Sequence, residues 1–203
     1  MKPRLFIKQK ITAFVNKYTI FEADEQGNTG RPLWYVQQKR LAFKEKVTFY
    51  DDEAHTSVAF TFRAEKVMDV HGKYFVEDSA GQVIGTFKKD FGASLTNSTW
   101  HILSPGSEVV LYEVKENNQT LALLRRFAGF IPILGDLADI VVAFFRYHFV
   151  FQDVKTGEAV GKHQKTTLFY DNYSVSLTDE AYQAIGQKTA AAFGVALDAL
   201  QSR

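Results

Sequence analysis

The sequence predicts a mainly β domain in which about a dozen strands pack around, or against, one C-terminal helix. Three observations predict this fold class. The chain contains 18 Phe and 9 Tyr, residue types that favour strands. Short runs of alternating apolar and polar residues recur along most of it, separated by turn residues. The last stretch instead repeats its apolar residues at spacings of three and four, which is the helical period.

The predicted strands are bounded by Gly, Asn and Asp residues, which favour turns. Their spacing is typical of a β-sandwich or a β-barrel. A weak repeat of strand, acidic turn with Gly, and strand begins at Tyr18, Tyr74 and Phe149. These turns lack the dense Asp and Asn ladder of a calcium loop, so we interpret them as turns only. The predicted strands cover residues 5–10, 18–23, 33–36, 42–50, 57–62, 67–70, 74–77, 83–88, 98–103, 108–115, 120–124, 146–152, 159–165 and 173–177.

Residues 178–200 form the predicted C-terminal helix. Thr178 or Asp179 can cap its first N–H groups, and Asp179 and Glu180 suit the positive end of the helix dipole. Several of its faces carry Ala and Gly where a surface helix normally carries Glu and Lys, which indicates close neighbours on several sides. At about 1.5 Å per residue it is roughly 33 Å long, enough to cross a small barrel. The alternative is an amphipathic helix packed on one side of a sheet.

The composition excludes several classes of function. The formal net charge of +1 argues against a dedicated nucleic-acid binder. The absence of Cys excludes disulfides, a thiol nucleophile and a zinc–thiolate site. The first residues lack the apolar core of a secretory signal, and no linker divides the chain. We therefore expect one cytoplasmic domain over residues 1–203.

The sequence contains no motif that indicates catalysis. No nucleophile elbow, phosphate loop or dinucleotide fingerprint is present. The histidines lack metal-ligand spacing, so we expect structural or surface roles for them; they are His55, His71, His101, His148 and His163. Basic groups are distributed among strand ends, and we interpret most of them as solvated. The expectation is a protein without catalytic residues or a cofactor.

The segment around residues 127–145 departs from the strand pattern. Arg125 and Arg126 precede this apolar run, and Arg146 follows it. A proline interrupts the run, and Asp136 can cap a helix in its second half. The sequence therefore predicts a helical insertion near residues 127–145.

Three roles remain open for this segment: a plug at one end of the β-structure, a membrane-contacting loop, or a protein–protein contact patch. In the membrane interpretation, Arg125, Arg126 and Arg146 bind anionic headgroups, at about 1 kcal/mol for each basic residue. The side chains expected to enter the apolar layer, or to contact a partner, are Phe127, Phe130, Ile131, Ile133 and Leu134.

Several short motifs together resemble the LURP-one-related family. They are Phe6-Ile7-Lys8-Gln9-Lys10, Lys17-Tyr18-Thr19-Ile20, Asp24-x-x-Gly27-Asn28, the repeated strand–Asp-x-x-Gly–strand units, and Asp171-Asn172-Tyr173 before the small-residue helix. That family belongs to the Tubby C-terminal-like superfamily, which also includes phospholipid scramblases. The resemblance implies a closed antiparallel barrel of about twelve strands threaded by the C-terminal helix, with no free sheet edge.

The resemblance also implies a function at membranes. Tubby proteins bind phosphoinositides, and scramblases act on lipids. We therefore expect a non-enzymatic barrel, cytoplasmic or peripheral to a membrane, that binds an anionic phospholipid headgroup or a membrane surface. The alternative is a protein–protein interaction module that uses residues 127–145. Neither interpretation involves nucleic acid.

Overall fold

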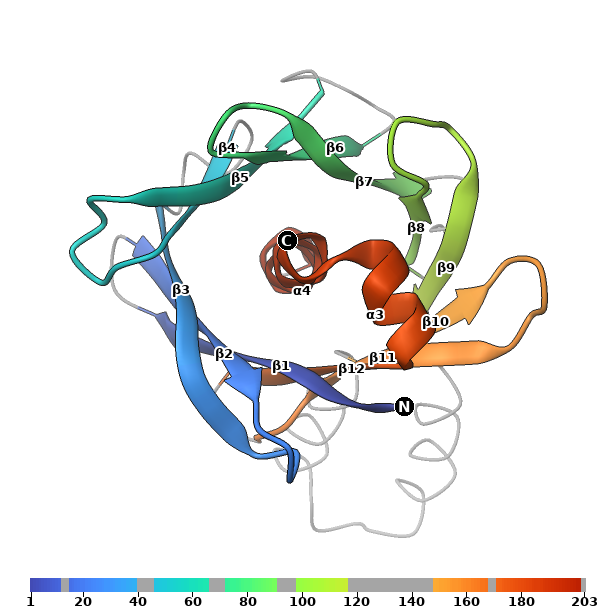
Figure 1. Ribbon diagram of the computed structural model, residues 1–203, viewed down its shortest axis with the longest axis horizontal. Helices are drawn as coiled ribbons and strands as arrows, with labels where there is room; N and C mark the ends of the chain where they lie inside the picture. Colours follow the sequence, from blue (N-terminus) through green and yellow to red (C-terminus); the bar gives the residue numbers. More distant parts are fainter. Residues whose placement is uncertain are drawn as a thin grey trace, which may run out of the picture.

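The computed structural model of the protein describes residues 1–11, 15–39, 46–65, 72–90, 98–116, 148–167 and 171–201. In these ranges twelve antiparallel strands form a closed barrel (Figure 1). Each strand pairs with its neighbours in sequence, and β1 closes the barrel by pairing with β12. The closed barrel that the resemblance implied is therefore confirmed.

The strands vary from five to eleven residues. Four predicted strand segments, residues 42–45, 67–70, 120–124 and 146–147, lie outside the described ranges, as does the predicted insertion near 127–145. The strands are β1 (Lys2–Ile11), β2 (Val15–Ala23), β3 (Thr29–Lys39), β4 (Lys46–Tyr50), β5 (Val58–Ala64), β6 (Lys73–Asp78), β7 (Val83–Asp90), β8 (Thr99–Leu103), β9 (Val110–Glu116), β10 (Phe149–Asp153), β11 (Ala159–Lys165) and β12 (Asn172–Leu177).

The alternation in the sequence corresponds to the two faces of the barrel wall. In β2, Tyr18 and Ile20 are buried, whereas Lys17 is exposed. Successive side chains of a strand point to opposite faces, so every second residue enters the interior. The barrel interior is therefore the hydrophobic core.

The C-terminal segment forms two helices, not the single helix predicted over residues 178–200. They are α3 (Asp179–Ile185) and α4 (Gln187–Gln201). The chain turns at Gly186, which has a φ of 79°, a conformation that favours glycine. The predicted cap is confirmed, because the Thr178 hydroxyl accepts a hydrogen bond from the Ala181 N–H at 3.2 Å. α3 lies across one mouth of the barrel, and α4 runs through its centre (Figure 1).

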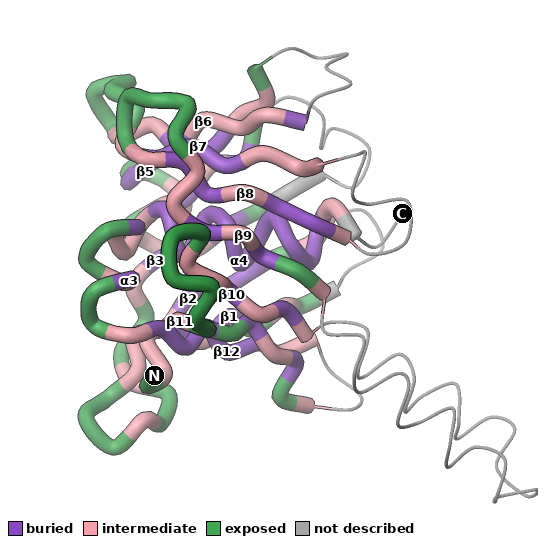
Figure 2. Tube along the Cα trace, turned by 90° about the vertical axis from the view of Figure 1, so that its right-hand side faces the viewer, coloured by how far each residue is buried: buried purple, intermediate pink, exposed green. Residues whose placement is uncertain are grey.

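The position of α4 decides between the two helix packings left open by the sequence. All residues from Thr189 to Ala199 are buried (Figure 2). α4 contacts β1, β12, β5, β6 and β7, which come from opposite sides of the barrel. An amphipathic helix packed on one side of a sheet would leave its outer face exposed to solvent. The amphipathic-helix alternative is therefore wrong. The enclosed helix is shorter than predicted, about 22 Å for its 15 residues.

Small residues allow the barrel wall to approach α4 closely. A Cβ atom added to Gly194 would lie 2.5 Å from Cδ1 of Ile7 and 3.3 Å from Cγ2 of Val175. These contacts explain why the helix carries little side-chain bulk. The prediction of close neighbours on several sides is confirmed.

The two ends of the barrel differ in their connections. In an antiparallel meander, alternate connections fall at the same end. One end, here called the turn end, has the short turns 24–28, 51–57, 79–82, 104–109 and 154–158, together with α3. At the other end, here called the attachment end, the strands are joined by the connections that contain residues 12–14, 40–45, 66–71, 91–97, 117–147 and 168–170. The C-terminal end of α4 lies at the attachment end (Figure 2).

Candidate functional site

The lipid-contact residues predicted from the sequence lie outside the described ranges. They are Arg125, Arg126, Phe127, Phe130, Ile131, Ile133, Leu134 and Arg146. The structure does define where their segment is attached. Residues 117–147 connect β9 to β10, and Glu116 pairs with Phe149 across these two strands. The segment therefore leaves and re-enters the barrel wall at neighbouring positions.

The barrel interior is filled by side chains. Phe193 of α4 is 1% exposed, and its ring centre lies 5.2 Å from that of Phe87, 5.7 Å from that of Phe151 and 6.0 Å from that of Trp100. A ligand could enter this region only by displacing these rings. The outer surface is the more accessible place for binding.

One buried polar cluster ties α4 to the wall. The Asp198 carboxylate is 5% exposed and accepts a hydrogen bond from the Tyr18 hydroxyl at 2.8 Å. The Tyr173 hydroxyl donates to the same carboxylate, and the Gln9 amide donates to the Tyr18 oxygen at 3.1 Å. Burial raises the pKa of Asp198, while the two tyrosine hydroxyls lower it. Asp198 therefore links α4 to β2 and β12, the two strands on either side of β1, and we assign it a structural role.

His163 lies beside this cluster and is fully enclosed. Its ring stacks on Tyr173 with a centroid distance of 5.0 Å and an angle of 19°. Neither ring nitrogen has a hydrogen-bond partner among the described residues. Burial lowers the pKa of His163 to about 3, and His148 contributes to this shift. The ring is therefore neutral at pH 7, and its surroundings are those of a core residue.

Cationic side chains are brought together by the strand register. Like charges directly opposite each other on neighbouring strands destabilise a sheet. Among the strand residues that the structure describes, three such cationic pairs occur, and all of them involve long, flexible side chains. The pairs are Lys10 with Lys17, Lys46 with Arg63, and Lys73 with Lys88.

Only part of this positive charge is neutralised. Arg63 forms an ion pair with Glu77 at 2.8 Å, and Lys73 forms one with Glu108 at 2.5 Å. In contrast, Lys10, Lys17 and Lys46 are exposed and make no ion pair within the part of the chain that the structure describes. The prediction of separate solvated basic groups overlooked this clustering, because it depends on the hairpin register.

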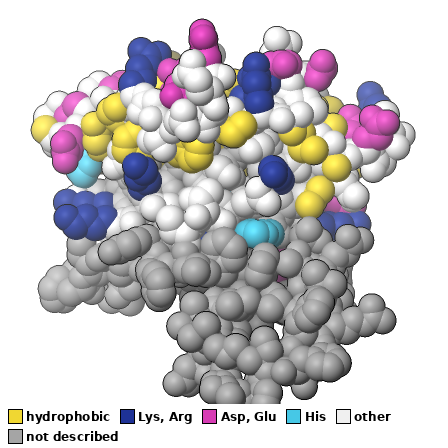
Figure 3. Space-filling view, turned by 90° about the horizontal axis from the view of Figure 1, so that it is seen from below, with side chains coloured by type: hydrophobic (Ala, Val, Ile, Leu, Met, Phe, Trp, Pro, Cys, Tyr) yellow, Lys and Arg dark blue, Asp and Glu magenta, His cyan; other side chains and the backbone are white. Residues whose placement is uncertain are grey.

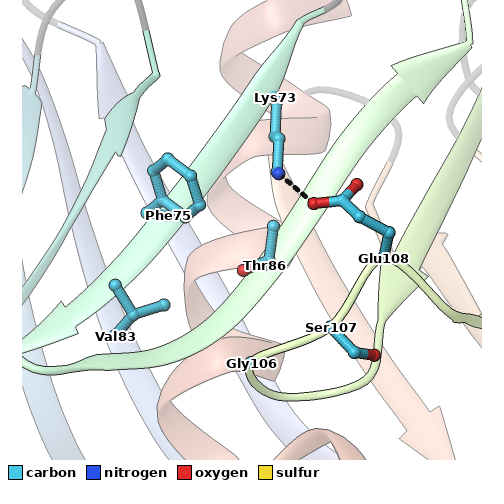
Figure 4. Close-up of a pocket in the computed structure, with 7 residues that line it drawn as sticks. All are labelled: Lys73, Phe75, Val83, Thr86, Gly106, Ser107 and Glu108. Carbon is cyan, nitrogen blue, oxygen red and sulfur yellow. Dashed lines mark hydrogen bonds and ion pairs between the residues drawn. The ribbon is translucent and has the colours of Figure 1, made fainter.

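An open groove crosses the outer face of β6 and β7. It has a volume of about 470 Å³, and the turn between β8 and β9 forms one wall (Figure 4). The Lys73 ammonium lies 5.1 Å from the centre of the Phe75 ring and is paired with Glu108, which lowers the pKa of that carboxylate. Because Lys73 and Glu108 neutralise each other, neither of these two charges is left unpaired for a ligand.

Two further observations limit the chemistry of the described residues. Within them, no three His, Asp or Glu side chains gather closely enough to hold a metal ion. Neither α3 nor α4, the helices in the described ranges, has the length and hydropathy of a membrane-spanning helix.

The fold and its filled interior define a class of protein, a closed twelve-stranded barrel built around its own C-terminal helix. The sequence model of the LURP-one-related family matches residues 33–198, which cover most of this barrel. The chain belongs to the LURP-one-related family. A search of the curated proteins finds no similar sequence.

Proposed function

We propose that this LURP-one-related barrel is a non-enzymatic protein that binds anionic lipid headgroups at a membrane surface. The observation that carries the proposal is the segment joining β9 to β10. Arg125 and Arg126 precede its apolar run and Arg146 follows it, and the two strands that it joins are paired at Glu116 and Phe149. In the sequence, the basic residues therefore flank the apolar run within a connection whose two ends are anchored on neighbouring strands.

This combination suits a membrane surface for two physical reasons. Each basic residue near an anionic surface contributes about 1 kcal/mol. Burial of apolar side chains in the lipid adds roughly 25 cal/mol for each Å² removed from water. The filled barrel interior also favours recognition of a surface over enclosure of a whole lipid molecule.

The test is co-sedimentation with vesicles of phosphatidylcholine and phosphatidylserine, with pure phosphatidylcholine vesicles as the control. We expect the wild-type protein to bind the mixed vesicles, with an affinity that decreases as salt screens the charges. The Arg125→Glu/Arg126→Glu variant should bind at least about 25-fold more weakly, because two contributions of about 1 kcal/mol are lost.

The matched control is Arg31→Glu/Lys155→Glu, which makes the same change in net charge at the turn end. This variant should bind nearly as well as the wild type. If the wild-type protein stays in the supernatant with mixed vesicles at low salt, the lipid proposal is wrong. Light scattering would then show whether residues 127–145 mediate association with a second copy, the protein-contact alternative.

A further inference from the structure

The acidic residues at the turn end have a local structural cause. The carboxylate of Asp24 accepts a hydrogen bond from the Asn28 N–H, and that of Asp52 accepts bonds from the Thr56 and Ser57 N–H groups. Asp78 and Asp153 make equivalent bonds within their own turns. The meander places all of these turns at one end, so negative charge accumulates there. The acidic residues at this end are Asp24, Glu25, Asp51, Asp52, Glu53, Asp78, Glu108, Asp153, Glu158, Asp179 and Glu180.

The attachment end carries exposed positive charge on the neighbouring strands β1 and β2 and on β4, which is separated from β2 by β3. Lys8, Lys10, Lys17 and Lys46 are exposed near the ends of β1, β2 and β4, and we call this group the basic rim. None of the four forms an ion pair with another described residue. In Figure 3, acidic side chains lie mainly towards the upper rim, and several basic side chains lie lower, beside the grey region.

The basic rim shares its end of the barrel with the attachment of residues 117–147. Its nearest strand, β1, is three strand-to-strand steps from β10, or about 14 Å around the wall, and β4 is six steps from β10. Lys10 and Lys17 face each other directly, an arrangement that costs stability in isolation. Near an anionic surface, attraction of both ammonium groups to the lipid headgroups would offset their mutual repulsion.

We propose that the barrel docks end-on on an anionic membrane, with its attachment end towards the lipid and its turn end towards water. This inference rests on the lipid-binding function proposed above and adds the orientation and the basic rim. The net charge of +1 conceals this arrangement, because the acidic turns gather at one end and the basic rim lies towards the other. Each end also carries some residues of the opposite charge: Lys2, Arg4, Arg31 and Lys155 at the turn end, and Glu65, Asp90, Glu116 and Asp171 at the attachment end.

The two ends of the barrel are far enough apart for an anionic membrane to attract the basic rim without strongly repelling the acidic turns. The nine residues of β2 span about 30 Å, which corresponds to roughly 22 Å along the axis of a barrel with tilted strands. The Debye length at physiological salt is about 8 Å. The basic rim can therefore lie within one Debye length of the lipid while the acidic turns are screened from it.

The first test compares two triple variants with the same change in net charge. Lys10→Gln/Lys17→Gln/Lys46→Gln removes charge from the basic rim, and Lys2→Gln/Arg31→Gln/Lys155→Gln removes it from the turn end. Each rim lysine contributes about fivefold in affinity, so the rim variant should bind mixed vesicles about 100-fold more weakly. The turn-end variant should stay within about threefold of the wild type.

The outcomes separate this inference from the proposed function. Equal losses in the two triple variants would overturn end-on docking. Wild-type binding by the rim variant, together with loss of binding in Arg125→Glu/Arg126→Glu, would also overturn it while leaving the lipid-binding function in place. Absence of wild-type binding would overturn both. Because these are exposed surface changes, both triple variants should keep the stability of the wild type to within about 1 kcal/mol.

The second test measures orientation directly. The chain has no Cys, so a single introduced thiol can be labelled specifically. Thr156 and Thr166 are both exposed and lie at opposite ends of β11. An environment-sensitive fluorophore on Thr166→Cys should shift to the blue with mixed vesicles, whereas the same label on Thr156→Cys should not. A shift at position 156 alone, or equal shifts at both positions, would contradict the proposed orientation.

Discussion

Replacement of Phe193 by alanine is expected to lower the free energy of unfolding by about 3–5 kcal/mol. Phe193 projects from α4 and contacts the aromatic rings of Phe87, Trp100 and Phe151, which come from three different strands of the wall. The backbone of a closed barrel cannot collapse far to refill the space, so most of the cavity cost should remain. Urea denaturation followed by circular dichroism measures the loss.

The control for this variant is Val83→Ala. Val83 is 45% exposed on β7, so its truncation should cost less than about 0.5 kcal/mol. Similar values for Phe193→Ala and Val83→Ala would show that Phe193 is not a core residue.

The second large effect is a loss of stability in acid that arises from His163. In the unfolded chain His163 takes up a proton near its ordinary pKa of about 6.5, whereas burial holds the folded pKa at about 3. Between these two values the unfolded state binds more protons, so stability falls as the pH decreases. Each pH unit in this window should cost up to about 1.4 kcal/mol. Urea denaturation at a series of pH values measures the slope.

The His163→Phe variant isolates this contribution. Phenylalanine keeps an aromatic ring against Tyr173 but cannot bind a proton, so the variant should have a flatter stability profile between pH 6.5 and pH 3. Asp198 has a raised pKa, so its protonation in acid acts in the opposite direction in both proteins. Identical slopes for the wild type and His163→Phe would contradict a neutral, buried His163.

The sequence predicted the helix environment better than the helix geometry. Ala and Gly on several faces of residues 178–200 indicated enclosure, and the structure confirms it. The break at Gly186 was missed because the sequence does not distinguish this residue from Gly194. Both glycines lie in the same small-residue pattern, but Gly194 lies inside α4. Only the backbone conformation, with a φ of 79° at Gly186, distinguishes these two glycines.

The sequence could not bring together residues that the fold makes neighbours. Tyr18 and Asp198 lie at opposite ends of the chain, and only closure of the barrel around α4 joins them. Pairing of Lys10 with Lys17 depends on the register of one hairpin. A signal for the charge polarity was nevertheless present, because the repeated acidic turns come after every second strand. The lipid-contact roles of Arg125, Arg126 and Arg146 stay predictions.

Enclosure of α4 is the central claim, because it fills the interior and leaves the outside of the barrel for binding. The most direct test is the stability of Gly194→Leu. On a solvated helix, leucine in place of glycine should raise the free energy of unfolding by somewhat less than about 1 kcal/mol, because leucine is the better helix former. Inside the barrel, the new side chain would meet Ile7 and Val175.

We therefore predict that Gly194→Leu lowers the free energy of unfolding by about 2–3 kcal/mol in urea denaturation. The double variant Ile7→Ala/Gly194→Leu should lose less than the sum of its two single variants, because the shortened side chain makes room for the leucine. Stabilisation by Gly194→Leu, or strict additivity with Ile7→Ala, would contradict the enclosure of α4 by the barrel wall.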